Sequence, residues 1–114
     1  MAEPVSVANL IAGGWKEAAF GPFRPGVDMC RLAGDPEGAS VALLRYEPGA
    51  RVPLHEHMGI ETILVLDGVQ YDDRGRYEAG SMVVNPAGSQ HRVWSDEGCV
   101  VLILWEKPVR ILEE

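Results

Sequence analysis

The sequence has few basic residues, only two cysteines and no long apolar run. Asp and Glu total 17 and Lys and Arg total 10, which gives a formal net charge of −7. An acidic chain without a basic cluster is poorly suited to bind a phosphate backbone, so we expect no nucleic-acid partner. The longest apolar run covers residues 100–105. A helix needs roughly 20 apolar residues to cross a bilayer, so we expect no membrane partner either.

The scarcity of cysteine limits the kinds of site that the chain can build. Cys30 and Cys99 are too few for a disulfide framework and too far apart for a structural zinc knuckle. The N-terminus lacks the basic segment followed by an apolar segment that marks a secretory signal. Two reduced thiols in a cytoplasmic protein are therefore the simplest interpretation.

Turn-forming residues are abundant, with 13 Gly and 8 Pro, and they favour many short strands over a helix bundle. Asp67-Gly68 is expected to end one strand, and residues 72–75 are expected to form a hairpin turn. A strand spacing of roughly 8–12 residues is typical of a sandwich or barrel, so we predict an all-β fold. The predicted strands cover residues 27–32, 39–46, 51–57, 61–66, 69–71, 76–77, 82–85, 91–95, 100–105 and 109–112.

Residues 1–26 differ from the rest of the chain. Gly and Pro interrupt this segment repeatedly, and Trp15, Phe20 and Phe23 are spaced among them. We predict an irregular N-terminal arm over residues 1–26, whose aromatic side chains dock on the domain or on a neighbouring subunit. Residues 27–114 are predicted to form a single domain.

The three histidines are the most informative residues. His55 and His57 are two positions apart, so on a strand both imidazoles project from the same face. Glu61 begins the next predicted strand, and an antiparallel neighbour can return its carboxylate to the same space. His91 opens a later strand. A lone buried histidine is more often a satisfied core residue, but three imidazoles and one carboxylate together suit a divalent transition metal with open coordination positions.

The wider spacing of these residues resembles the two motifs of the cupin superfamily. Segments 44–49, 65–69 and 95–99 narrow the likeness to the ChrR-like cupin group, although Ser95 stands where the second motif usually ends in Asn. The resemblance implies a double-stranded β-helix (jelly-roll) barrel of the RmlC-like type, a metal held by His55, His57, Glu61 and His91, and a homodimer. The motif residues are Gly49, His55, His57, Glu61 and Gly68 in the first half, and Gly80, Pro86, Gly88 and His91 in the second.

The resemblance implies two alternative functions. The first is a dioxygenase-type enzyme that uses Fe, Mn or Ni on a small oxygenated organic molecule, such as a diketone or hydroxyketone. The second is a zinc-binding ChrR-like sensory or binding cupin without turnover. A sugar isomerase or epimerase is less favoured, since no Arg and Lys cluster lies near the motifs. ChrR-type anti-sigma factors carry an N-terminal zinc domain, and residues 1–26 contain no His or Cys, so that function is not expected.

Other polar and aromatic residues are weaker candidates. A Ser–His or Cys–His catalytic pair is excluded if every histidine is a metal ligand. Asp72 and Asp73 are most simply explained as solvated charge. Residues that could line a pocket, but more often belong to a core or an interface, are Arg45, Tyr46, Tyr71, Tyr77, Trp94, Cys99 and Trp105.

Overall fold

The computed structural model describes residues 3–113, and nearly all regular structure in that range is β. No helix in the described part of the chain is long and apolar enough to cross a membrane. A short 3-10 helix, η1 (Gly14–Glu17), precedes the strands. The strands are β1 (Gly21–Arg24), β2 (Val27–Gly34), β3 (Ser40–Tyr46), β4 (Ala50–Glu56), β5 (Glu61–Asp72), β6 (Gly75–Glu78), β7 (Met82–Asn85), β8 (Gln90–Ser95), β9 (Cys99–Trp105) and β10 (Arg110–Ile111).

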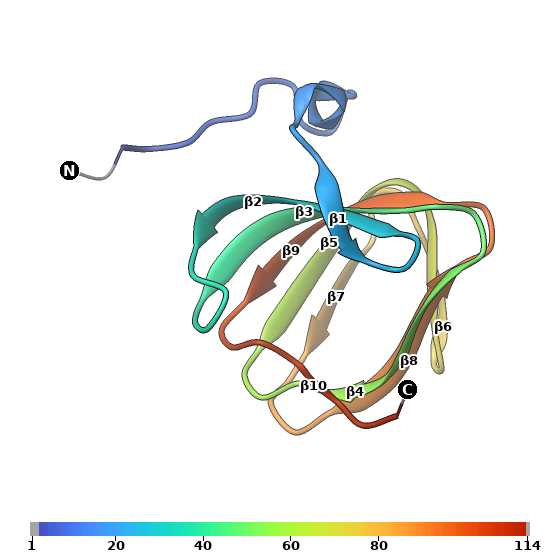
Figure 1. The fold of residues 1–114 in the computed structure, drawn as a ribbon. Helices are drawn as coiled ribbons and strands as arrows, with labels where there is room; N and C mark the ends of the chain where they lie inside the picture. Colours follow the sequence, from blue (N-terminus) through green and yellow to red (C-terminus); the bar gives the residue numbers. More distant parts are fainter. Residues whose placement is uncertain (1–2, 114) are drawn as a thin grey trace.

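The strands form a sheet that curls into a barrel (Figure 1). One layer has the order β1-β2-β3-β9-β5, with β7 on the other edge of β5. The facing layer contains β8, β4 and β10, and β6 pairs with the far end of β5. The all-β fold predicted from the turn spacing and the barrel implied by the cupin resemblance are therefore confirmed.

Strand β5 connects the two layers and corrects one prediction. The strand was expected to end at Asp67-Gly68, but it continues to Asp72. The register against β9 shifts between Val65 and Asp67, which is the signature of a β-bulge that bends a strand without ending it. Gly68 has a φ of 73°, and a Cβ there would lie 2.1 Å from the carbonyl oxygen of Gly98. This glycine is required by close strand approach, not by a turn.

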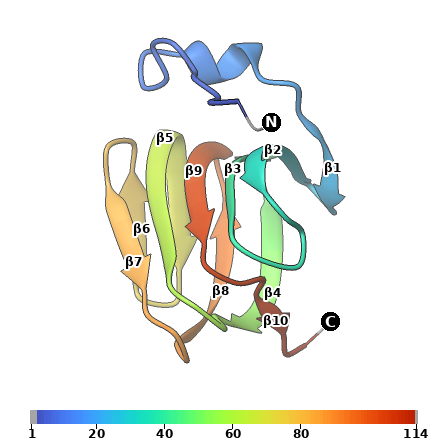
Figure 2. The same ribbon diagram turned by 90° about the vertical axis from the view of Figure 1, so that its left-hand side faces the viewer.

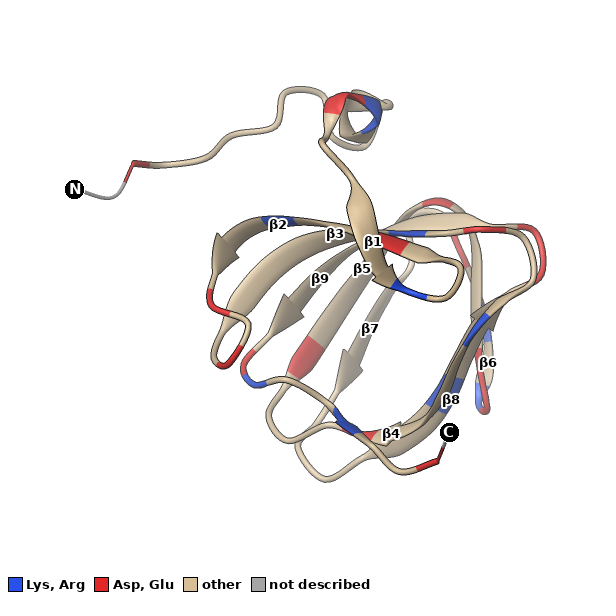
Figure 3. Ribbon diagram, viewed as in Figure 1, with Lys and Arg blue, Asp and Glu red and all other residues tan. Residues whose placement is uncertain are grey.

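Apolar side chains on the two faces of the sheet form two clusters. The inner cluster includes Ile63, Val65 and Val93, together with Val101 and Ile103. The outer cluster is built on Leu43, Leu66 and Val100. Alternation along each strand assigns neighbouring residues to opposite faces, so the apolar strand β9 supplies both clusters. Figure 3 shows that β3, β9, β5 and β7 carry few charged positions, whereas many lie in the loops.

The N-terminal segment lies across the outside of this sheet (Figures 1 and 2). Trp15 and Phe20 pack against the outer cluster, so these aromatic side chains dock on the sheet of their own chain. Phe23 lies on β1, a strand that was not predicted and that pairs antiparallel with β2 at the edge of the sheet. Pro22 is tolerated there because an edge strand leaves one row of N–H groups unused. The division of the chain at residue 26 stays a prediction.

Candidate metal centre

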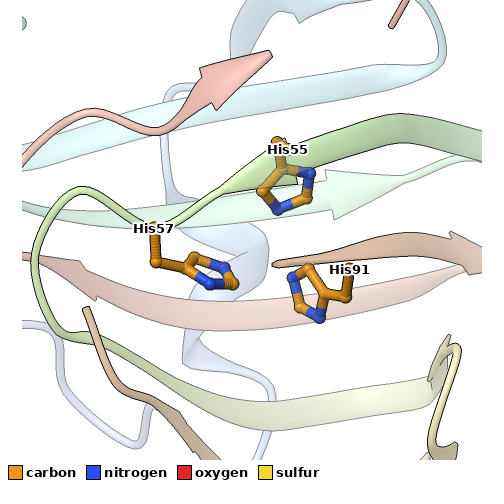
Figure 4. A group of neighbouring side chains, drawn as sticks. All are labelled: His55, His57 and His91. Atoms are coloured by element: carbon orange, nitrogen blue, oxygen red, sulfur yellow. The ribbon is translucent and has the colours of Figure 1, made fainter. Parts of the chain in front are cut away.

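The three histidines converge inside the barrel from two paired strands (Figure 4). His55 on β4 is the direct cross-strand partner of His91 on β8. His57 follows β4, and its backbone N–H donates to the carbonyl of Ser89 at 2.9 Å. The ligand nitrogens of the three side chains all lie within 4.8 Å of one another. All three residues are at most 4% exposed, so they point into the interior and not to solvent.

A shift in strand register aims His55 and His57 inward. Val52 packs against the inner core, so strict alternation would turn position 55 to the outer face. The register of β4 against β8 shifts between Val52 and His55, and Pro53, which has no N–H to donate, lies within that irregular stretch. Because of this bulge, the side chain of His55 points to the interior. Alternation along the strand then directs the side chain of His57, two positions later, to the same side.

Each imidazole contacts a hydrogen-bond acceptor through its Nδ1 atom. The Nδ1 of His55 lies 2.8 Å from the Pro53 carbonyl oxygen, and that of His57 lies 3.0 Å from the Ser89 carbonyl oxygen. The Nδ1 of His91 lies 3.0 Å from Oδ2 of Asp72. Because carbonyl and carboxylate oxygens only accept, Nδ1 carries the proton in each ring and a neutral imidazole then has its lone pair on Nε2.

The Nε2 atoms are left without hydrogen-bond donors. Those of His57 and His91 are buried and have no hydrogen-bond partner within residues 3–113. Buried polar atoms are normally satisfied, so two orphaned lone pairs beside each other indicate a site for an electrophile. This arrangement fits a divalent transition cation, for which neutral imidazole Nε2 is a preferred ligand.

Glu61 lies at the edge of the histidine group. Its Oε1 is 3.1 Å from Nε2 of His57 and 4.0 Å from Nε2 of His91. Two hydrogen bonds hold the buried carboxylate in place, one from Nε1 of Trp105 to Oε2 at 2.7 Å and one from Nδ2 of Asn85 to Oε1 at 3.1 Å. A carboxylate oxygen and an imidazole lone pair at 3.1 Å repel unless a proton or a cation lies between them.

Burial and local contacts set the charge of these groups. Burial lowers the pKa of His55 and of His91 from the ordinary value, so both rings are neutral at neutral pH. Burial raises the pKa of Glu61, but a proton or cation shared with His57 and the hydrogen bond from Trp105 outweigh it, and the net shift is downward. Neutral imidazoles beside an ionised carboxylate are the states that bind a metal ion.

Asp72 is a supporting residue that the sequence did not identify. Although it was interpreted as solvated charge, its side chain is buried. Its Oδ1 accepts from the backbone N–H groups of Arg74 and Gly75 at 2.8 and 3.1 Å and from the hydroxyl of Tyr77 at 2.8 Å. Burial raises the pKa of Asp72, but these bonds and His91 reverse the shift, so the pKa is lowered. Because β5 continues to Asp72, alternation places Asp72 on the same face as buried Gln70. The prediction that the strand ends at Gly68 did not allow this inference.

A cavity of about 220 Å³ opens beside His55 and Glu61. Its walls are mainly apolar, and Tyr46 and Trp105 are among the lining residues. Burial raises the pKa of the Tyr46 phenol, as do nearby Cys99 and Glu61, so its hydroxyl stays protonated. A concave, mainly apolar space with a few polar groups is the usual form of a small-molecule site.

The other candidates from the sequence lie elsewhere. Arg45 is exposed and pairs with Asp28, and the ring of Tyr71 stacks on that of Trp94 away from the cavity lining. The remaining two are fully or nearly buried. Ser95 donates from Oγ to the Val69 carbonyl at 2.5 Å. Cys99 belongs to the inner core, where burial raises its thiol pKa to about 12.

Comparison with known proteins places the fold and the site in one family. The model of the ChrR Cupin-like domain matches residues 10–109. The chain belongs to the ChrR cupin-like family. It is 33% identical over 76 residues to the anti-sigma-E factor ChrR of Cereibacter sphaeroides, an alignment that covers 64% of this chain and 36% of that protein. The cupin chain thus spans only about a third of the length of this relative.

Solved structures support the cupin fold. The complex of Rhodobacter sphaeroides SigE with the anti-sigma ChrR matches with a TM-score of 0.69 and 27% identity, over 79% of this chain and 49% of that chain. A cupin-like protein from Ralstonia eutropha matches with a TM-score of 0.66 and 26% identity, over 71% of this chain and 55% of that one. An acetylacetone dioxygenase from Acinetobacter johnsonii has a TM-score of 0.79 over 100% of this chain and 80% of its own, but 15% identity, so it supports the fold alone.

Proposed function

We propose that this cupin is a metal-dependent, dioxygenase-type enzyme whose metal ligands are His55, His57, Glu61 and His91. The observation that carries the proposal is the convergence of unpartnered, buried Nε2 atoms beside an ionised carboxylate. The proposed substrate is a small oxygenated organic molecule of the diketone or hydroxyketone kind. The neighbouring cavity of about 220 Å³ supports a ligand of that size.

The residues around the proposed ligands have separate tasks. A divalent metal bound there supplies Lewis acidity and open coordination positions, and Fe, Mn or Ni adds redox chemistry that Zn lacks. Asp72 and the carbonyls of Pro53 and Ser89 hold the imidazole protons on Nδ1. Trp105 and Asn85 orient the carboxylate of Glu61. Such outer hydrogen bonds keep ligands in one orientation and tautomer.

The cavity side chains position the substrate in this proposal. Apolar walls exclude water and select a compact carbon skeleton. The protonated hydroxyl of Tyr46 and the amide of Gln70 are polar groups in that lining, and both can donate hydrogen bonds to substrate oxygens. Three neutral imidazoles and one carboxylate leave one positive charge with a divalent ion, which favours an anionic oxygen such as an enolate.

A zinc-binding sensory or binding cupin without turnover is the second candidate. Its support is the sequence likeness to ChrR, at 33% identity, which exceeds the 15% identity to acetylacetone dioxygenase. Under this proposal the same four ligands hold zinc, and the cavity takes a ligand that is bound but not converted.

Metal analysis and oxygen uptake distinguish the two candidates. Protein purified without added metal is analysed for Fe, Mn, Ni and Zn, then loaded with Fe(II) and tested for O₂ consumption on a panel that includes 2,4-pentanedione and 2-hydroxyacetophenone. Fe-dependent uptake that disappears in Glu61→Gln supports the enzyme. Stoichiometric zinc, with no uptake for any panel member after full Fe loading, favours the binding module and contradicts the enzyme.

We also propose that the protein forms a homodimer through the outer face of the sheet. Val84 on β7, Thr62 on β5 and Leu104 on β9 are cross-strand neighbours in one row. Val84 is 53% exposed, Leu104 42% and Met82, in the adjoining row, 66%. Light scattering of wild type and of Leu104→Asp tests this proposal: a dimeric mass is expected for the first and a monomeric mass for the second. A monomeric wild type at micromolar concentration contradicts it.

The assignment to the cytoplasm is likewise a proposal. Its support is that Cys30 and Cys99 are both free thiols, as is usual in a reducing compartment.

A further inference from the structure

A single arginine on the inner face of β2 stands out from the apolar residues around it. Val27 and Met29 pack against the inner core, whereas Cys30 and Leu32 pack against the outer cluster. Alternation therefore assigns Arg31 to the inner face, and its side chain lines the cavity beside Glu61. The register shift between β2 and β3 comes directly after this position. The inner row of β2 thus ends in a guanidinium in place of an apolar side chain.

The guanidinium of Arg31 is not satisfied by the protein. Its Nε and Nη1 atoms are buried and have no hydrogen-bond partner in the part of the chain that the structure describes. Burying N–H groups without acceptors is unfavourable. By contrast, several arginines at the surface are paired: Arg45 with Asp28, Arg92 with Glu113 and Arg110 with Glu56. A half-buried arginine that lines a cavity and has two buried, unpartnered guanidinium nitrogens indicates that an anion completes the site.

The surroundings favour an anion over a cation or a neutral group. Glu61 is the only acidic residue in the cavity lining of residues 3–113, and it belongs to the proposed metal centre. Arg24 on β1 also lines the cavity, and Figure 3 shows basic positions on both β1 and β2. A protein with a net charge of −7 therefore gathers positive charge in an apolar space, where electrostatic attraction is stronger than in water.

We propose that Arg31 binds a carboxylate of a small organic ligand that occupies this cavity. A guanidinium presents parallel N–H donors that match the two oxygens of a carboxylate. At the opposite end of the ligand, an oxygen atom faces the metal centre, and this part of the inference rests on the proposed function. The substrate class is then a short keto acid. Apolar walls between the two polar ends accommodate its carbon chain.

Binding measurements with matched pairs of probes test the inference. Straight-chain carboxylates of four to six carbons, among them 4-oxopentanoate, are titrated calorimetrically against their neutral amides. Each titration uses the full chain as purified and again after chelator treatment. We expect at least one carboxylate to bind wild type about tenfold or more tightly than its amide, because only the carboxylate can form a charge-assisted hydrogen bond with the guanidinium. Arg31→Met should lose this preference, and Arg31→Lys should keep part of it.

A matched control and a second measurement separate ligand binding from a structural role. Arg76→Met removes an exposed arginine on β6 that lies outside the cavity lining, and it should bind like wild type. Without ligand, Arg31→Met should unfold at a higher temperature than wild type, because two buried N–H-bearing nitrogens without acceptors have been removed. A lower unfolding temperature, no carboxylate preference in wild type, or a preference that survives in Arg31→Met would each overturn the inference.

The outcome is independent of whether the enzyme proposal holds. Loss of the carboxylate preference between wild type and Arg31→Met, both treated with chelator, reports on Arg31, whereas metal content and oxygen uptake report on the histidines and Glu61. If the carboxylate titrations fail, the metal and oxygen measurements can still be interpreted, and the reverse also holds.

Discussion

Replacing Asp72 by asparagine tests whether the histidine tautomers control metal binding. The carboxylate contacts the Nδ1 of His91 through Oδ2, while Oδ1 accepts from the backbone of Arg74 and Gly75 and from Tyr77. In Asp72→Asn, the amide oxygen must keep the Oδ1 position. Turning the amide over would face its NH₂ group to three donors, at a cost of about 0.5–1.5 kcal/mol for each lost bond.

The NH₂ group of the substituted side chain in Asp72→Asn therefore faces His91, and the imidazole must accept at Nδ1. Its proton moves to Nε2, which is the atom that faces the centre of the histidine group. To bind a metal through Nε2, His91 must then move its proton back to Nδ1. The Nδ1–H group and the NH₂ group of the substituted side chain then face each other as two donors, at a cost of about 1–3 kcal/mol. Each 1.4 kcal/mol is tenfold in affinity, so we expect metal affinity to fall roughly 10- to 100-fold, in the range seen when such outer hydrogen bonds are removed.

Competition with a chromogenic chelator, using Co²⁺ and Zn²⁺ at pH 7.5, measures this loss. Asp73→Asn is the matched control, because the neighbouring carboxylate is exposed and accepts only from the backbone N–H of Arg92 within the described residues. It should bind metal like wild type. An affinity in Asp72→Asn equal to that of wild type, with circular dichroism showing an intact fold, would refute the tautomer argument.

Three further predictions address the ligands, the carboxylate and pH. Alanine at any one of the three histidines should abolish stoichiometric metal binding in elemental analysis, and unchanged metal content would contradict the ligand assignment. Trp105→Phe keeps an aromatic ring but removes the donor to Glu61, so urea unfolding of the metal-free protein should show a loss of about 1.5–3 kcal/mol; an unchanged midpoint would exclude a role for this bond. Because burial lowers the pKa of His55 and His91 from 6.5, the unfolded chain binds more protons below about pH 6.5. The melting temperature of metal-free protein should hold above that pH and fall as the solution is acidified below it, and metal affinity should weaken in the same direction. A melting temperature that is constant from pH 7.5 to 5 would show that these rings are not buried as neutral groups.

Much of the barrel could be predicted because its signals are local. Strands expected at residues 82–85 and 91–95 correspond to β7 and β8 almost residue for residue, since Gly and Pro on either side limit where a strand can run. The prediction divided β5 into two strands, because a glycine after an aspartate is compatible in sequence with both a turn and a β-bulge. The register shift against β9 and the close approach of the Gly98 carbonyl oxygen, both of which are tertiary features, separate the two cases.

Sequence by itself determined the composition of the site: three histidines at motif spacing, a glutamate after a bend, and a small acidic β domain to hold them. These features depend on residue type and strand periodicity, which are readable along one segment. Tertiary structure alone decided that Asp72 holds the proton of His91, that Trp105 orients Glu61, and that Arg31 faces the cavity without a counterion among the described residues. Those properties arise from contacts, or from the lack of contacts, between residues far apart in the chain, and burial makes them strong because no water competes for the same groups.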